Sequence, residues 1–199
     1  MARRSDHSRE EIKEMALEAA VNILENEGSK GISARNVAKA IGYTVGTLYL
    51  VFENQRDMLL HLNALSLDDL DAWLEEHTGS GVTPAENLLQ LADAYISYAI
   101  EKSARWNLLF EILVDETNEL PDWYMVRLGR LFGRVESVLS PLAKQHGELE
   151  IQRAARVLWA GVHGICMLKI RQRLTLAGGQ TPNEMAKMLV DNFLEGFGK

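Results

Sequence analysis

Helix start signals recur along this chain of 199 residues, whereas no segment alternates apolar and polar residues for long enough to form a convincing strand. In a capping box, a serine or threonine side chain binds the backbone three residues later, and a glutamate at that position binds back. Such boxes begin at Ser8, Thr83 and Thr181, and the last two have proline at the first helical position. The sequence therefore predicts an all-α fold with about nine helices.

The helices are expected between these caps and the breaks that follow them. Ser33 and Thr44 are the expected caps of two short helices, and Gly42 should end the first of the two. Pro141 should end or kink the helix that follows Pro121. The longer helices are expected at 55–77, after Thr83, around 104–114, after Pro121, at 150–177 and after Thr181.

Charge is spread unevenly along the chain. The net charge of −7 by itself argues against nucleic acid as a partner, because phosphate binding favours a positive surface. Residues 1–56 hold eight basic and eight acidic residues, whereas residues 57–199 hold 13 basic and 20 acidic ones. The N-terminal part is thus neutral and the remainder is acidic.

The sequence favours a protein of the cytoplasm. Its start, MARRSDHSREE, has no apolar core after the arginines that would form a secretory signal. The longest uncharged run, residues 157–168, is shorter than the roughly 20 apolar residues of a membrane span. A single cysteine, Cys166, allows no intramolecular disulfide framework and no cysteine-rich zinc site. We therefore expect no membrane partner, no metal and no cofactor.

The N-terminal third matches the plan of a helix-turn-helix, in which the third helix enters the major groove of DNA and the second supports it. Residues 31–52 read GISARNVAKAIGYTVGTLYLVF. This segment resembles the DNA-binding domain of the TetR (tetracycline-repressor-like) family, whose most recognisable run is GTLY, here residues 46–49, followed by Phe52. The resemblance implies a DNA-binding domain over residues 1–53 and a helical ligand-binding and dimerisation domain over residues 54–199.

The residues of the third helix suit contact with DNA. Gly46 costs about 1 kcal/mol of helix stability relative to alanine, but its missing side chain lets the backbone approach a groove closely. Thr47 offers a hydroxyl and a methyl group to base edges, and Tyr49 can reach a phosphate. Ser33 and Thr44 mark helix N-termini, where anions bind well.

The resemblance adds further DNA-binding positions. Arg35 and Val45 correspond to family positions that face bases. Gln55 stands where the family commonly has a lysine, which removes one phosphate contact. Arg3 and Arg4 would compensate for that loss if they form a flexible basic arm.

The run VLWAGVHGICML at 157–168 carries no charge on any side, and a helix that is apolar all round must be buried all round. One face can pack on its own domain, so the other needs a partner. Two such helices from each of two chains would form the four-helix homodimer interface of TetR-like proteins, and WAGVHG at 159–164 resembles the Trp-His-Gly signature of one subgroup. The expected interface residues are Ala160, Gly161, Gly164, Met185, Met188, Leu189 and Phe193.

Several aromatic residues predict a cavity for an effector. Trp106 and Phe110 lie one turn apart on one short helix, and with Tyr95 and Trp73 from other helices of the second domain they would wall an apolar site. Glu111, with Asp115 one turn later, would favour a cationic molecule if it faced inward. The expected effector is therefore a small hydrophobic or cationic molecule.

His163 and Cys166 lie three residues apart and suggest a nucleophile with its base, but no oxyanion site or orienting carboxylate accompanies them. A structural histidine and an inert thiol are the favoured interpretation.

We expect a sequence-specific homodimeric transcriptional regulator, a repressor that its ligand releases from a palindromic DNA operator. The alternatives are a helical enzyme, which would need a convergent set of titratable groups, and a ligand-independent DNA-binding or partner-binding protein, whose interior would be filled by side chains.

Overall fold

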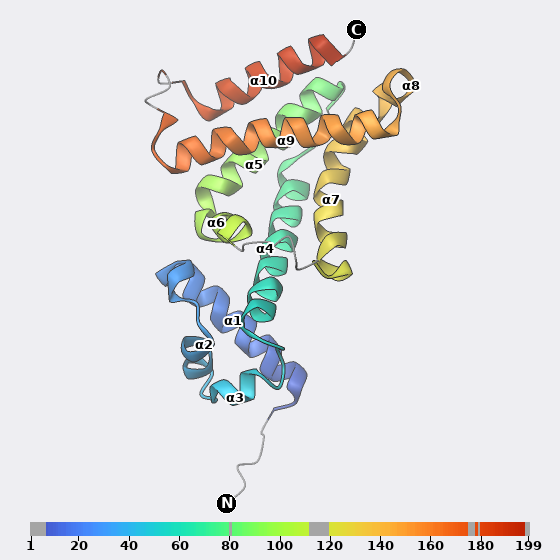
Figure 1. The fold of residues 1–199 in the computed structure, drawn as a ribbon. Coiled ribbons are helices and arrows are strands. Elements are labelled where there is room, and N and C mark those ends of the chain that lie inside the picture. Colours follow the sequence, from blue (N-terminus) through green and yellow to red (C-terminus); the bar gives the residue numbers. More distant parts are fainter. Residues whose placement is uncertain (1–6, 80, 112–119, 175–177, 179, 198–199) are drawn as a thin grey trace, which may run out of the picture. The chain divides into compact units, whose positions relative to one another are not determined.

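The computed structural model describes residues 7–79, 81–111, 120–174, 178 and 180–197. These residues form an all-α fold, as expected, with no β-strand in the described ranges (Figure 1). Two short 3-10 segments, Ser29–Gly31 and Ser140–Leu142, accompany ten α-helical segments. The α-helices are α1 (Arg9–Glu27), α2 (Ala34–Ala40), α3 (Val45–Leu48), α4 (Gln55–His77), α5 (Pro84–Glu101), α6 (Ser103–Glu111), α7 (Asp122–Leu139), α8 (Ala143–His146), α9 (Glu148–Ile170) and α10 (Pro182–Phe197).

The helix starts follow the sequence closely. Ser8 and Thr83 cap α1 and α5 in complete capping boxes with Glu11 and Glu86. At α10, the Thr181 hydroxyl accepts a bond from the backbone of Glu184, whose carboxylate binds back to the backbone of Thr181. The predicted starts of these three helices are confirmed. They could be predicted because side chains within three residues of each start determine them.

The predicted end of the long helix at 150–177 is wrong, because α9 stops at Ile170. Gln172 adopts a left-handed backbone with φ of 54°. The N–H of Arg173 then donates to the carbonyl of Leu168 at 2.8 Å, and the N–H of Gln172 donates to Lys169 at 3.0 Å. This geometry closes a helix in the way a terminal glycine usually does. No glycine marks the position, so the sequence carries no stop signal there.

The chain folds into two compact units, each described here by itself. The described residues of 1–66 and 104–119 form the first unit, and those of 67–103 and 120–199 form the second. The division falls within α4, whereas the functional boundary expected after residue 53 stays a prediction. In the described ranges, no helix is both long and apolar enough to cross a membrane.

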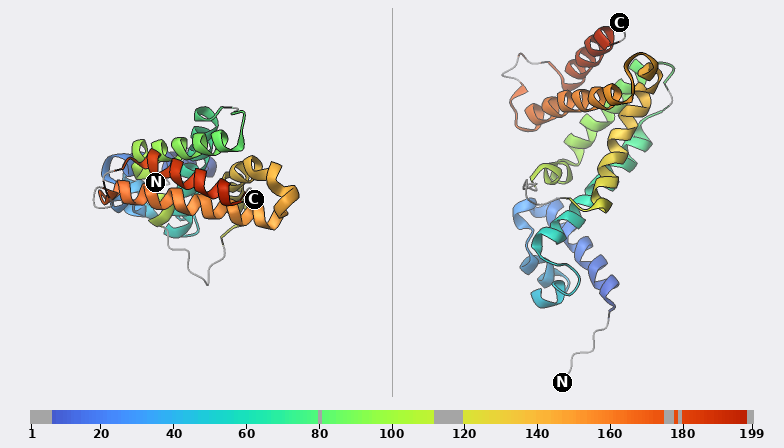
Figure 2. Two further views of the ribbon diagram at one scale, coloured as in Figure 1. Left: turned by 90° about the horizontal axis from the view of Figure 1, so that it is seen from above. Right: turned by 45° about the vertical axis from the view of Figure 1, so that its right-hand side comes forward.

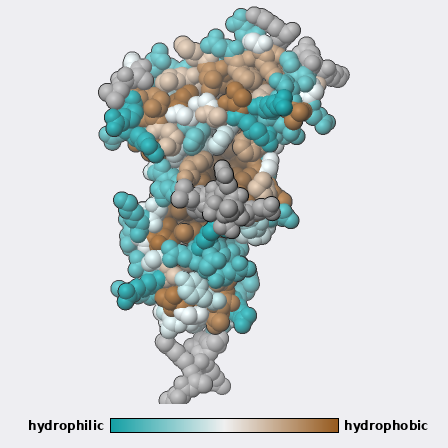
Figure 3. Space-filling view, in the orientation of Figure 1, coloured by the Kyte–Doolittle hydropathy of each residue, from teal (hydrophilic) through white to brown (hydrophobic). Residues whose placement is uncertain are grey.

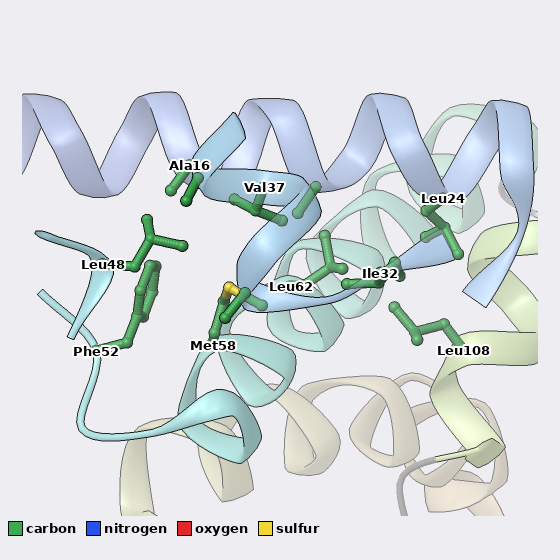
Figure 4. Packing of buried hydrophobic residues seen from close by; sticks show 12 residues of the cluster. Ala16, Leu24, Ile32, Val37, Leu48, Phe52, Met58, Leu62 and Leu108 are labelled. Atoms are coloured by element: carbon green, nitrogen blue, oxygen red, sulfur yellow. The ribbon is translucent and has the colours of Figure 1, made fainter. Parts of the chain in front are cut away.

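The first unit has a core built from α1 to α4 and α6. Leu48 and Phe52 lie beside each other beneath α1, where each is at most 2% exposed (Figure 4). Leu108 of α6 joins the same cluster. Its other labelled members are Ala16, Leu24, Ile32, Val37, Met58 and Leu62. The short helices α2 and α3 are thus held by buried side chains rather than by their own length, since helices this short are marginal in water.

In the second unit, α9 and α10 lie along each other, and α7 lies beside the C-terminal half of α4 (Figures 1 and 2). Acidic residues at helical spacing on α4 face arginines at the same spacing on α7. The ion pairs join Arg127 to Asp68, Arg130 to Asp68 and Asp71, and Arg134 to Asp71 and Glu75. This ladder fixes the register of the two helices, although partly exposed pairs of this kind add little stability each.

Candidate nucleic-acid interface

The turn between α2 and α3 requires a glycine. Gly42 has φ of +73°, a conformation that other residues rarely adopt. The N–H of Tyr43 then donates to the carbonyl of Ala38 at 2.9 Å, and the N–H of Gly42 donates to Lys39 at 3.2 Å. These bonds stop α2 and turn the chain directly into α3, which gives the helix-turn-helix connection that the sequence predicts.

Both expected caps are formed. The Ser33 hydroxyl accepts the N–H of Asn36 at 3.1 Å, and the Thr44 hydroxyl accepts the N–H of Thr47 at 3.2 Å. The hydroxyls of Thr44 and Thr47 also lie 3.0 Å apart in a hydrogen bond. Only one of the two hydroxyl protons is used in that bond, so the pair keeps one donor for an outside acceptor.

One side of α3 is anchored and the other is open. Leu48 is 1% exposed in the core, whereas Tyr49 is 46% exposed. Gly46 is exposed, and a Cβ atom added there would meet nothing nearer than the Thr44 hydroxyl at 3.7 Å. No contact among the described residues therefore requires glycine at this position. Val45 is half-buried and packs against the core, so it offers less of its surface than expected.

Two more expected DNA-binding residues flank α3. Arg35 on α2 and Gln55 at the start of α4 are both exposed. The side chain of Asn54 caps α4 by accepting the N–H of Asp57 at 2.9 Å, so the first turn of the helix beside Gln55 is capped. Arg3 and Arg4, the expected basic arm, lie outside the described residues.

The structure brings together only some of the expected effector residues. Trp106 is completely buried and its ring lies 4.9 Å from that of Phe110, which is 40% exposed. Glu111 is exposed rather than facing inward, and Asp115 lies outside the described residues. These three described residues belong to the first unit.

The other two expected effector residues, Trp73 and Tyr95, belong to the second unit. The indole N–H of Trp73 donates to the carbonyl of Ala94 at 3.0 Å. The Tyr95 hydroxyl lies 3.2 Å from Nδ1 of His163, whose ring stacks on Trp159 at 5.2 Å. Both aromatic residues thus have hydrogen-bonding roles within this unit.

His163 and Cys166 agree with the favoured structural interpretation. Burial lowers the pKa of His163, because desolvation disfavours the imidazolium. Cys166 is 1% exposed, and burial raises the pKa of its thiol to about 12. A thiol with this pKa is protonated at neutral pH and is therefore a poor nucleophile.

The expected dimer residues divide into two groups. Gly161 and Leu189 contact each other within one chain, because a Cβ atom at Gly161 would overlap the Leu189 side chain. Gly164, by contrast, has nothing within 4 Å of an added Cβ atom, and Ala160 and Met188 are exposed. Met185 and Phe193 are half-buried. Over α9 and α10, hydrophobic residues lie among polar ones on the face shown in Figure 3.

Two exposed apolar residues of this surface escaped prediction from the sequence. Val157 and Leu168 of α9 are 57% and 39% exposed. Together with Gly164 they follow helical spacing along one side of α9, next to the exposed Ala160. Both lie at the ends of the uncharged run at residues 157–168, which signals an apolar surface. The sequence alone does not tell which residues of this run pack inward and which stay exposed.

Comparisons with known proteins agree with this geometry. Residues 16–62 match the family described as bacterial regulatory proteins, tetR family, and residues 88–193 match the tetracyclin repressor-like C-terminal domain. No curated protein matches the chain in sequence.

Solved structures show the same fold. A protein of unknown function from Rhodococcus sp. RHA1 has 21% sequence identity and a TM-score of 0.75, with 98% of each chain covered. Thermus thermophilus FadR, a TetR family transcriptional repressor solved in complex with lauroyl-CoA, has 19% identity and a TM-score of 0.66, covering 92% of this chain and 94% of that one. The TetR family transcriptional regulator PfmR, also from Thermus thermophilus, has 19% identity and a TM-score of 0.58, covering 90% and 97%.

Proposed function

The chain belongs to the tetR family of bacterial regulatory proteins, and we propose that it is a homodimeric repressor that a small apolar molecule releases from a palindromic operator. The family consists of DNA-binding transcription factors rather than enzymes, which sets aside a helical enzyme. The observation that carries the proposal is the open side of α3, where no described neighbour of Gly46 requires a glycine.

On this proposal, α3 enters the major groove with its exposed side toward the bases. Gly46 lets the helix backbone approach the groove, and the Thr44–Thr47 pair offers its remaining hydroxyl donor to a base or phosphate acceptor. The exposed Tyr49 hydroxyl and the N-terminus of α2 at Ser33 bind phosphates. The exposed Arg35 on α2 supplies positive charge to this surface.

The second unit provides dimerisation in this proposal. The exposed apolar residues Val157, Ala160 and Leu168 on α9, with Met188 on α10, would be buried against the same residues of a second chain. Gly164 leaves room for the partner helix to approach closely, since an added Cβ atom would meet no other described residue within 4 Å. A two-fold dimer would present two copies of α3 to the half-sites of a palindrome.

A hydrophobic effector is better supported than a cationic one. Glu111, the residue that would have attracted a cation, is exposed, whereas Trp106 is completely buried. Thermus thermophilus FadR, which shares the fold, was solved with lauroyl-CoA, a molecule with a long apolar chain. An effector acts only if it binds the released form more tightly than the DNA-bound form. A regulator without ligand is the remaining alternative.

Footprinting of the purified protein on the DNA that flanks its own gene tests the proposal. We expect protection of a near-palindromic site with half-site centres about one helical turn apart or somewhat more. A screen of hydrophobic compounds by tryptophan quenching, followed by DNA release with each hit, tests the effector. Protection of an asymmetric site, or the absence of any protected site at low salt, would contradict the proposed function. DNA release by none of the bound compounds would favour the ligand-independent alternative.

A further inference from the structure

Two polar residues are fully buried among the described residues, and both lie on α4 within one turn of each other. Asn63 and Ser66 are each 1% exposed. Ser66 donates its hydroxyl to the carbonyl of Leu62 at 3.3 Å. Asn63 differs, because neither its amide nitrogen nor its amide oxygen has a hydrogen-bond partner in the part of the chain that the structure describes. The middle of α4 therefore holds a fully buried side-chain amide whose nitrogen and oxygen both lack a hydrogen bond to the described residues.

An unsatisfied buried amide is costly, because the group has lost its bonds to water and gained none in return. Native proteins pair the great majority of such groups. The surroundings on the helix are apolar, since Leu59 packs against the core of the first unit, Leu60 is 3% exposed and Leu62 is completely buried. A leucine at position 63 would match its apolar neighbours without the free-energy cost of burying an unpaired amide. The asparagine therefore points to a hydrogen-bond partner from outside the chain.

We propose that Asn63 is the polar anchor for the effector, which is a neutral molecule with an apolar body and an amide-like head. The inference rests on the proposed effector release and names the chemistry of the molecule. An asparagine presents a donor and an acceptor side by side, and a carboxamide, lactam or imide presents the complementary pair. The leucines around Asn63 suit an aliphatic or other apolar body.

Two probes of similar size separate the headgroup from the body. Decanamide carries both a donor and an acceptor, whereas methyl decanoate carries acceptors only. Isothermal titration calorimetry without DNA measures the binding of each probe to the full chain. We expect wild type to prefer decanamide by about tenfold, because only decanamide can satisfy both ends of the Asn63 side chain.

The variant Asn63→Leu keeps the branched shape and removes both polar atoms. It should bind the two probes equally, within about twofold. Asn63→Ala is a second variant for the case that leucine prevents folding, and circular dichroism checks both. Leu65→Ala, on the same helix at an exposed position, is the matched control and should keep the tenfold preference.

Equal binding of the two probes by wild type, failure of both to bind, or an unchanged preference in the Asn63 variants would each overturn the inference. Because the probes are measured without DNA, this result is separate from the proposed function. A chain that prefers decanamide but binds no duplex would contradict the repressor proposal and leave the role of Asn63 standing.

Discussion

Gly161 on α9 and Leu189 on α10 fit each other so closely that a Cβ atom at Gly161 would overlap Cδ2 of Leu189. The glycine thus serves the packing of two helices within one chain. Three residues later, a Cβ atom added at Gly164 would meet no other described residue within 4 Å. Two glycines of one apolar run therefore have different roles, and a pair of substitutions can separate them.

Gly161→Ala tests the packing inside the chain. Adding a methyl group should lower the free energy of unfolding by about 1–3 kcal/mol through overpacking. This loss opposes the gain of about 1 kcal/mol that alanine brings through its higher helix propensity. Gly129→Ala on α7 is the matched control and should gain stability, because the added Cβ atom would meet no other described residue within 4 Å. Urea unfolding of both variants gives the comparison. Equal stabilisation by the two alanines would show that α10 does not pack tightly at Gly161.

Gly164→Arg tests the dimer. A Cβ atom added at Gly164 would meet no other described residue within 4 Å, so we expect the substitution to leave the fold intact and to disturb only the interface. An unpaired charge buried in an apolar interface costs several kcal/mol, enough to separate two subunits. Sedimentation should therefore show a monomer, whereas Gly129→Arg on α7 should remain dimeric like wild type. A Gly164→Arg protein that sediments as a dimer would place the interface elsewhere.

Gly46→Ala should change stability and DNA binding in opposite directions. The free protein should gain about 0.5–1 kcal/mol, because alanine costs less backbone entropy and meets only the Thr44 hydroxyl at 3.7 Å. Affinity for operator DNA should fall at least tenfold, because the methyl group keeps α3 away from the groove. Urea unfolding and fluorescence anisotropy measure the two effects. A variant that gains stability and binds DNA like wild type would refute a close approach at Gly46.

His163 should make stability depend on pH. Its pKa is lowered in the folded chain by burial, so below the ordinary value of 6.5 the unfolded chain binds a proton that the folded chain takes up less readily. Stability should thus be full above pH 6.5 and fall as the pH drops below it. His163→Asn, which can still hydrogen-bond Tyr95, should show a smaller loss between pH 8 and pH 5.5.

Urea midpoints at the two pH values provide the measurement. The carboxyls of Glu11, Glu86 and Glu184 have lowered pKa values because of hydrogen bonds at helix caps, so they titrate below this range. The remaining histidines are common to both proteins and cancel in the comparison. An identical pH dependence in wild type and His163→Asn would exclude His163 as its source.

Local chemistry explains what the sequence could predict. The starts of α1, α5 and α10 depend on side chains within three residues, and the α2–α3 turn depends on Gly42. These features need no knowledge of distant contacts. The end of α9 escaped prediction because Gln172 takes a backbone conformation that its residue type does not signal.

Tertiary packing explains what the sequence could not predict. Whether Gly161 or Gly164 faces its own chain depends on the placement of α10, and both belong to the same uncharged run. The exposure of Glu111 depends likewise on how α6 packs. Asn63 stands among leucines in the sequence, but only its burial without a partner distinguishes it from an ordinary surface asparagine.

The most direct test of α3 as the DNA-reading helix is the binding of wild type and Tyr49→Ala to the footprinted duplex between 50 and 200 mM salt, followed by fluorescence anisotropy. Wild type should bind with an affinity that falls steeply with salt, because phosphate contacts release counterions. Tyr49→Ala should bind at least tenfold more weakly with an unchanged circular dichroism spectrum, since the Tyr49 side chain is 46% exposed. Met125→Ala, at an exposed position on α7, should bind like wild type. Undetectable binding by wild type at 50 mM salt, or equal binding by Tyr49→Ala, would contradict the assignment of α3 as the DNA-reading helix.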